Sequence, residues 1–320
     1  MAKYILKRAF LIIPTLIVVL TVVFCLLRLV PGSPAYELLL EENDGQAPTA
    51  EQIEAKETEM GLNDPLPVQW WNYVKGIFSG NWGISYFNGK PVFQNMLDVW
   101  EPTLIIAGYA TVITVVIAIP TGIFCATHRN SLADYAISTL STATMVIPGM
   151  CVGLLFLYFF AFKLSIFPAS GYKTIDRVGW GTALYYLTLP SFSLGLHHVA
   201  SMARYTRSTM LDVLSQDYIR TARAKGLSRN KIYYKHALKN TLSIVGTMIA
   251  SSIVHMIGGA SVTEKVFNIR GMGTLAVSSL GRRDYPQEQA IVLFTAFMSL
   301  GLNLAMDIMY KLLDPRIEYD

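Results

Sequence analysis

Charged side chains are scarce in this chain of 320 residues. Asp, Glu, Lys and Arg make up 15% of it, whereas 52% of the residues are hydrophobic. The mean hydropathy is +0.40, which is high for a water-soluble protein. Long apolar runs, rather than a uniform apolar excess, distinguish a membrane protein from a soluble one. The length of the apolar runs therefore decides whether this composition belongs to a membrane protein.

Cysteine is also rare, and the three cysteines are Cys25, Cys125 and Cys151. All three lie inside apolar runs, with no CxxC spacing. A buried thiol behaves as a small hydrophobic group. The sequence therefore predicts neither a disulfide nor a metal site.

Motifs that carry catalysis are missing as well. A phosphate loop, GxxxxGK(S/T), cradles nucleotide phosphates with backbone N–H groups and one lysine. The nearest stretch, "GISYFNGKP" at Gly83–Pro91, is one residue too long and has no Ser or Thr after Lys90. HExxH, GxSxG and EF-hand patterns do not occur either. We therefore predict a chain that has no catalytic residue, binds no cofactor and does not hydrolyse ATP.

What the chain does have is long apolar runs. The first, Ala9–Val30, follows the basic residues Lys3, Lys7 and Arg8. A helix needs about 20 apolar residues to cross a bilayer, so this run is long enough. A cleaved signal peptide begins in the same way but has a shorter apolar region, and its cleavage would fall near "GSPA".

Five further runs follow the first, and together they predict an all-α integral membrane protein with about six transmembrane helices. The fourth run is the weakest, because it contains Pro190, His197 and His198. The five runs are Thr103–Thr127, Ala136–Phe162, Ala183–Ala203, Leu242–Thr263 and Ala290–Tyr310.

Charge sets the predicted orientation, because cytoplasmic loops carry an excess of Lys and Arg. The N-terminus is basic and six spans return the chain to the same side, so both termini are predicted to be cytoplasmic. The loop 204–241 has nine basic and two acidic residues, whereas 31–101 has eleven acidic and three basic ones. We therefore divide the chain into 1–30 with the first span, an extracytoplasmic loop 31–101, and a core 102–320.

The basic loop contains "DYIRTARAKGLSRNKIYYKHALKN", Asp217–Asn240, with seven basic residues and one acidic residue. The pattern predicts two short helices, capped by Ser215 and Ser228, that are separated by Gly226 in a left-handed conformation. This elbow has the shape and charge to fit a groove on another protein. The charge is also explained by the orientation rule alone or by contact with anionic lipid heads, whereas nucleic-acid binding fits poorly.

The same stretch resembles the cytoplasmic loop of ATP-binding-cassette (ABC) importer permeases, in the branch that imports dipeptides, oligopeptides and nickel. Its "RTARAKG" and "HALKN" are similar to that branch, although Arg220 stands at the glutamate of the general Glu-Ala-Ala motif. Further similar segments are Gly61–Tyr86, Val262–Gly273, "RRDYP" and "DPRI". The resemblance implies the type I importer permease fold in a bacterial or archaeal plasma membrane.

The resemblance also implies partners: a second homologous permease, two ATPase subunits that use ATP and Mg, and an extracytoplasmic solute-binding protein. It assigns the contact with the ATPase to the elbow. The residues implied are Arg220, Thr221, Ala222, Arg223, Ala224, Lys225, Gly226, Leu227 and Ser228.

Polar and small residues within the predicted spans are candidates for the transport path or its gate. They are His255, Gly258, Gly259, Asn303 and Asp307, each of which has helix packing as its alternative role. Arg28, near the end of the first span, is expected to extend to the outer surface.

The sequence leaves three alternative functions open: import of another cargo, secondary transport and membrane-bound catalysis. The importer class also carries nickel and metal chelates. A secondary transporter usually has a repeat and intramembrane acids, and the predicted spans contain only Asp307 and no clear repeat. A membrane enzyme would need a paired acid or a Ser and His at depth, and the spans contain no convincing pair.

Overall fold

The computed structural model describes residues 2–313, and every named element in that range is a helix. The only β feature there is an isolated bridge between Ile84 and Pro91. The helices are α1 (Ala2–Leu29), α2 (Pro34–Glu42), α3 (Ala50–Glu59), α4 (Leu66–Phe78), α5 (Val92–Leu97), α6 (Trp100–Thr127), α7 (Leu132–Val146), α8 (Gly149–Phe156), η1 (Leu157–Lys163), α9 (Ile175–Leu214), α10 (Asp217–Ala224), η2 (Lys231–Ala237), α11 (Leu238–Val266), α12 (Met272–Arg282) and α13 (Tyr285–Leu313).

Four helices are long and apolar enough to cross a membrane. They are Phe10–Leu29, Trp100–Thr127, Lys231–Val266 and Tyr285–Ala305. A fifth candidate is the pair α7 with α8 and η1, which bends by 102° around the "IPG" break. Each of these coincides with a predicted run, so the all-helical membrane fold is confirmed with four to five candidate spans.

The predicted fourth span, Ala183–Ala203, lies inside α9 but does not meet the same test of length and hydropathy. α9 is 40 residues long and is interrupted near its start, where Gly179 has φ +74°. Its polar residues, which include the two adjacent histidines, lower its hydropathy. Six spans, the orientation and the extracytoplasmic placement of 31–101 therefore stay predictions.

The described residues group into two compact units. The first unit contains residues 2–101 and Gly271–Leu304, and the second contains Pro102–Arg270 and residues 305–313. The first unit thus brings α12 and most of α13 together with the N-terminal third of the chain. The division predicted from the sequence, into 1–30, 31–101 and 102–320, instead placed α12 and α13 with the core 102–320.

Within the first unit, α5 packs on α12 and α13 through a small apolar core. Its buried members are Val92, Met96, Met272, Ala290 and Ile291. The acidic segment before α4 forms two short helices, α2 and α3. Thr49 starts α3 with a capping box, in which its side chain and that of Gln52 each accept from the other's backbone N–H.

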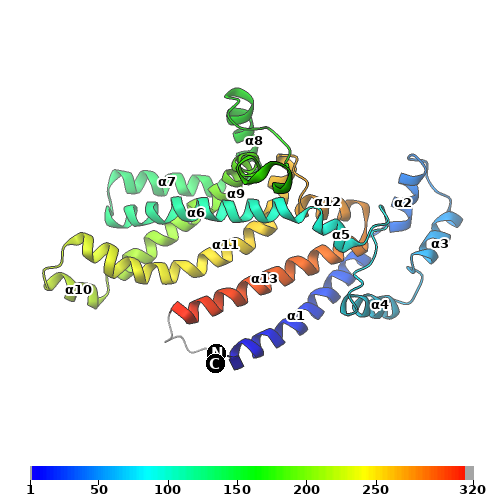
Figure 1. The fold of residues 1–320 in the computed structure, drawn as a ribbon, viewed down its shortest axis with the longest axis horizontal. Coiled ribbons are helices and arrows are strands. Elements are labelled where there is room, and N and C mark those ends of the chain that lie inside the picture. The colour runs from blue at the N-terminus through cyan, green and yellow to red at the C-terminus, as the bar shows by residue number, and fades with distance from the viewer. Residues whose placement is uncertain (1, 314–320) are drawn as a thin grey trace. The chain divides into compact units, whose positions relative to one another are not determined.

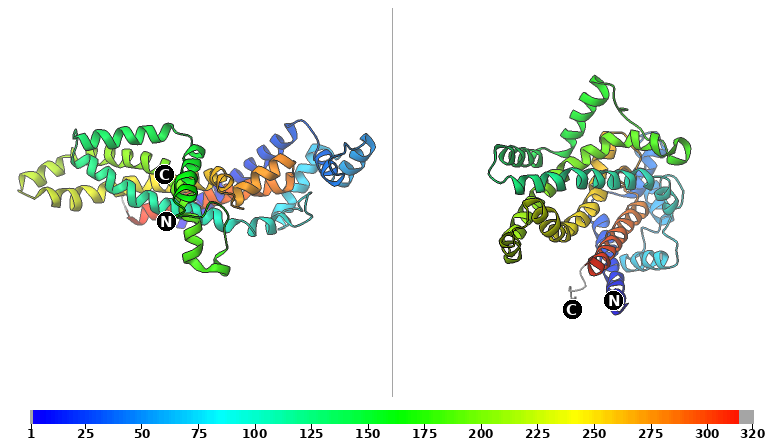
Figure 2. Two further views of the ribbon diagram at one scale, coloured as in Figure 1. Left: turned by 90° about the horizontal axis from the view of Figure 1, so that it is seen from above. Right: turned by 60° about the vertical axis from the view of Figure 1, so that its left-hand side comes forward.

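Within the second unit, α9 packs against α7, α8 and α11, and Figures 1 and 2 show these helices beside α6. Small residues allow the close approaches. A Cβ at Gly122 of α6 would lie 2.6 Å from the carbonyl oxygen of Ala203 and 2.6 Å from Thr206 Cβ. Thr114 of α6 also donates to the Gly195 carbonyl of α9 at 3.4 Å. Such contacts between small residues are how helices associate in membranes.

Candidate functional site

The elbow between α9 and α11 ends its first helix with a complete backbone cap. The Gly226 N–H donates to the Arg223 carbonyl at 2.9 Å, and the Leu227 N–H donates to the Ala222 carbonyl at 3.3 Å. These two bonds are the Schellman motif, which requires a left-handed residue just past the helix. Gly226 has φ +78°, and nothing lies within 4 Å of a Cβ built there. The glycine is therefore required by backbone conformation and not by crowding, as the sequence predicts.

A small core holds α10 in place from behind. Ile219 is fully buried and Ala222 is 7% exposed. They pack with residues of α6, α9 and η2, with Leu227 half-buried at the edge. The other buried members are Ile123, Ala126, Met210, Val213, Ile232 and Ala237. The elbow is thus a short helix packed onto α6, α9 and η2, and η2 continues directly into α11.

A side-chain hydrogen bond also holds α10 in place. The Asn240 side-chain amide, in α11, donates to the Tyr218 hydroxyl at 2.6 Å. This bond ties α10 directly to α11, which is a candidate membrane span.

The outer face of the elbow is basic. The structure turns Ala222 and Leu227 toward the supporting core, and it leaves the rest of the predicted coupling residues exposed. Those exposed residues are Arg220, Thr221, Arg223, Ala224, Lys225, Gly226 and Ser228. Arg220 pairs with Asp217 at 3.2 Å, and both side chains are largely exposed, so the pair contributes little to stability. The basic side chains are therefore available to a partner.

One detail of the predicted elbow is wrong. Ser215 does not cap α10: it ends α9, where its hydroxyl donates to the Asp212 carbonyl at 2.7 Å. Gln216 takes the N-cap position of α10 without a side-chain bond. The reason is that α9 continues to Leu214 and its last carbonyls need donors. The second helix does begin after Ser228, whose carbonyl accepts from the Ile232 N–H at 3.1 Å, and it continues from Lys231 as the π-helix η2.

A buried ion pair that the sequence did not predict fixes α7 to α9. Asp134 accepts from Arg207 Nε and Nη2, each at 2.7 Å, in a two-point contact. The Asp134 side chain is 2% exposed and that of Arg207 28%. The Asn130 N–H also donates to Asp134 at 3.0 Å. Hydrogen bonds from Arg207 and Asn130 satisfy the buried carboxylate, as an ion in this position requires.

The predicted path residues are distributed between the two units. His255 and Gly258 are exposed on α11, and a Cβ at Gly259 would lie 3.7 Å from Leu194 of α9. Asn303 is exposed on α13 in the first unit, and the side chain of Asp307 lies outside the described residues.

The expectation that Asp307 is the only acid in a span is wrong. Glu264, in the candidate span of α11, is fully buried and accepts from the Thr103 hydroxyl at 2.5 Å. The predicted run ended one residue earlier, at Thr263, because Glu264 and Lys265 lower the local hydropathy.

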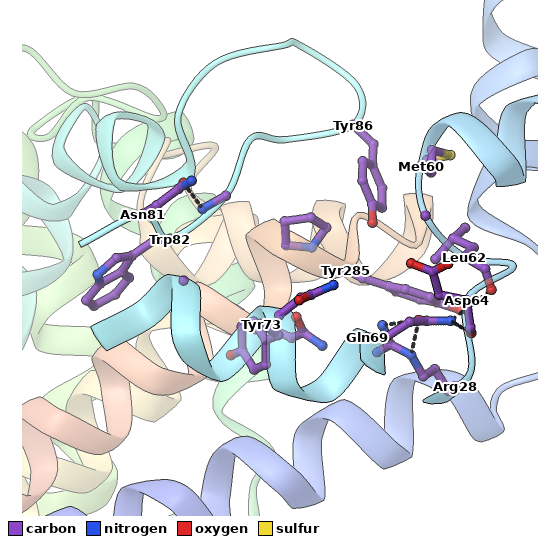
Figure 3. A pocket seen from close by; sticks show the side chains of 16 residues that line it. Arg28, Met60, Leu62, Asp64, Gln69, Tyr73, Asn81, Trp82, Tyr86 and Tyr285 are labelled. Carbon is purple, nitrogen blue, oxygen red and sulfur yellow. Dashed lines mark hydrogen bonds between the residues drawn. The ribbon is translucent and has the colours of Figure 1, made fainter. Parts of the chain in front are cut away.

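The first unit contains a pocket of roughly 280 Å³ whose residues come from α1, α4, α13 and the loops beside them (Figure 3). Arg28 is one of its lining residues. Its Nε and Nη2 donate to the Gln69 side chain at 3.0 and 2.8 Å, and its guanidinium lies 3.5 Å from the centre of the Phe24 ring. Arg28 is thus half-buried among protein groups, and its extension to the outer membrane surface stays a prediction.

The loop Gly83–Tyr86 closes one side of this pocket and is held by Asp284. The Ser85 hydroxyl donates to the Asp284 carboxylate, and the Tyr86 N–H donates to the same group at 3.2 Å. Burial raises the pKa of Asp284 above its usual value, although these two hydrogen bonds oppose the shift. Burial likewise raises the pKa of the Tyr86 phenol to about 12.

These features define a helical, multi-pass membrane protein with an exposed basic elbow. Residues 118–319 match the family model of the binding-protein-dependent transport system inner membrane component. Residues 1–107 match the N-terminal model of the same membrane component. The chain therefore belongs to this family of transport-system membrane subunits.

Curated relatives match over the full length of both chains. The chain is 36% identical over 319 residues to a probable peptide ABC transporter permease of Sinorhizobium fredii. It is 36% identical over 321 residues to an oligopeptide transport system permease of Bacillus subtilis. It is 35% identical over 319 residues to the glutathione transport system permease of Escherichia coli K12.

A solved structure shows the same fold at low identity. A chain of the inward-facing methionine ABC transporter MetNI superposes with a TM-score of 0.56 at 15% identity. The match covers 70% of this chain and 98% of the MetNI chain. The two proteins therefore share the permease fold across most of the smaller one.

Proposed function

We propose that this chain is the membrane subunit of an ATP-driven importer of short peptides. Family membership and three full-length relatives with peptide, oligopeptide or glutathione in their names support this assignment. In this proposal six helices cross a bacterial or archaeal plasma membrane, with α9 as the fourth and both termini cytoplasmic. A second, homologous permease completes the path.

The observation that carries the proposal is the construction of the elbow. α10 presents exposed basic residues on one face and fixes Ile219 and Ala222 in a core on the other. A helix that is only a surface charge patch needs no such core. The elbow therefore serves to receive a force, and we assign that force to an ATPase subunit docked on its outer face.

The remaining parts follow from the same assignment. Two ATPase subunits bind ATP and Mg, because this chain has no phosphate loop of its own. A solute-binding protein delivers the peptide on the opposite side, where residues 31–101 lie. His255, Gly258 and Gly259 of α11, with Asn303 and Asp307 of α13, are proposed to line or gate the path between the two permeases.

The test is co-purification with the encoded neighbouring subunits, followed by ATPase and uptake assays in lipid discs and vesicles. The variant is Gly226→Asp, which adds a side chain and a negative charge at the elbow. We expect ATPase subunits to co-purify with the natural chain, and we expect the variant to lose assembly or to hydrolyse ATP without uptake. A chain that purifies alone and moves solute under an ion gradient would contradict the importer and indicate a secondary carrier.

A further inference from the structure

The pocket of the first unit contains a cation with no acidic partner. Among the described residues, no carboxylate lies within ion-pair distance of Arg28. Its protein contacts are two bonds to Gln69, one bond of 3.3 Å from Nη1 to the Phe24 carbonyl, and the rings of Phe24 and Tyr285, whose centres lie 3.5 and 5.4 Å from the guanidinium carbon. All of these are neutral. A half-buried guanidinium is normally matched by an anion, and its planar fork suits a carboxylate.

The other lining residues have the chemistry of a peptide site. Four amide side chains line the pocket, and they are Gln69, Asn72, Asn81 and Gln289. Amides both donate and accept, as the peptide bond does. Gln69 already accepts twice from Arg28 and donates to the carbonyls of Leu62 and Asp64, so the other three amides are the ones that can face a ligand. Gln289 is 4% exposed, and its amide nitrogen has no hydrogen-bond partner among the described residues.

The pocket also has an acid and an aromatic wall. Asp64 is exposed and lies at the same end of the pocket as Arg28 and Gln69 (Figure 3). It can pair with an ammonium group, and it disfavours a ligand of high negative charge such as a phosphate. Trp82, Tyr86 and Tyr285 supply apolar surface for a side chain. A volume of roughly 280 Å³ lies just below the usual range of ligand sites, about 300–1,000 Å³, which limits the ligand to a small molecule such as a peptide of two residues.

We propose that this pocket binds the free carboxylate of a short zwitterionic peptide, with Arg28 as the carboxylate ligand and Asp64 as the partner of the ammonium group. The proposal rests on the proposed function, because it makes the pocket a receiving site for the cargo on the side where the binding protein releases it. It assigns cargo recognition to the permease itself.

The experiment is calorimetric titration of the full chain in lipid discs, with no binding protein and no nucleotide. The probes are the dipeptide Ala-Ala, its C-terminal amide and its N-acetyl form. Loss of one charge-assisted contact corresponds to about tenfold in affinity, so the natural chain should bind Ala-Ala about tenfold more tightly than the amide. Arg28→Gln should bind both about equally.

Two further variants separate recognition from folding. Arg282 belongs to the same unit and pairs with Glu41 at 3.2 Å, but it does not line this pocket. Arg282→Gln should therefore preserve the difference between acid and amide. Asp64→Asn changes an exposed side chain and should remove the preference for Ala-Ala over its N-acetyl form, while it retains the preference for the acid.

Several results would overturn the inference. Equal binding of acid and amide by the natural chain, or a preference that survives Arg28→Gln, removes the carboxylate assignment. An anionic lipid that native mass spectrometry finds on the natural chain but not on Arg28→Gln, without dipeptide binding, would identify the ligand as a lipid headgroup. Weaker docking of the binding protein to Arg28→Gln, again without dipeptide binding, would identify a protein carboxylate.

The titration can disprove the pocket proposal without disproving the proposed function, and the reverse also holds. It requires no ATPase subunit, so a chain that binds dipeptides as described but couples to no ATPase would retain the pocket and lose the importer. A chain that couples to ATPases but does not distinguish acid from amide would retain the importer and lose the pocket.

Discussion

The backbone N–H of Leu227 donates to the carbonyl oxygen of Ala222 at 3.3 Å, across the left-handed Gly226. This bond reverses the chain at the end of α10 and turns Leu227 back onto the core that buries Ala222. Ala222 and Leu227 therefore both end α10 and anchor it to the core. The hydrogen bond between them also fixes the conformation of the exposed residues 223–226.

Replacement of Gly226 by alanine should weaken coupling without adding any clash. An L-residue in the left-handed region costs about 1 kcal/mol, and no atom lies near the new Cβ. We expect a lower ATPase rate or a lower ratio of uptake to hydrolysis in the assembled transporter. Gly89→Ala is the control, because Gly89 has φ +65° and equally open surroundings but lies in the first unit. Equal effects of both variants would contradict a specific role for the elbow.

The close approach of α6 to α9 should not tolerate a methyl group. In Gly122→Ala the Cβ would meet the Ala203 carbonyl oxygen at 2.6 Å, so the two helices would have to separate. Overpacking of this kind costs about 1–3 kcal/mol. Thermal unfolding in detergent should therefore show a lower midpoint. Gly108→Ala in the same helix has nothing within 4 Å and should be neutral or stabilising. A stable Gly122→Ala would show that the helices approach less closely.

Removal of the Asp134 carboxylate should be costly. Asp134→Ala leaves Arg207 unpaired against α7, and breaking a buried pair costs about 3 kcal/mol in the free energy of unfolding. The measurement is chemical unfolding followed by circular dichroism. Glu41→Gln serves as the comparison, because its pair with Arg282 is about half exposed and should contribute under about 1 kcal/mol. Similar losses for the two variants would contradict the importance of burial.

The first unit should become less stable as pH rises above the acid range. Burial raises the pKa of Asp284, so the folded state holds its proton more tightly than the unfolded state does. The stabilisation is complete below the ordinary carboxyl pKa and is lost as pH rises through the raised pKa. Melting between pH 4 and pH 7 should show this decline in the natural chain, and Asp284→Asn should reduce it. An unchanged pH profile in the variant would assign the decline to other groups.

Prediction from sequence works best where a property depends on neighbouring residues. The apolar runs and the left-handed Gly226 depend on local hydropathy and backbone sterics. The misplaced cap at Ser215 shows where this fails, because the residue that ends α9 is decided by how far α9 extends. The contacts of Arg28 were not predictable for a different reason: its hydrogen-bond partner Gln69 is 41 positions away in the sequence.

By itself, the sequence determines that this chain is a helical membrane protein with a basic elbow on one loop, because hydropathy, charge bias and one glycine act locally. Only the tertiary structure decides which side of the elbow stays exposed, since Ala222 is buried and Leu227 partly buried by residues of α6, α9 and η2. It also decides that Asp134 meets Arg207, 73 positions away, and that Arg28 lines a pocket with Asp64. These contacts join distant segments, and no local pattern specifies them.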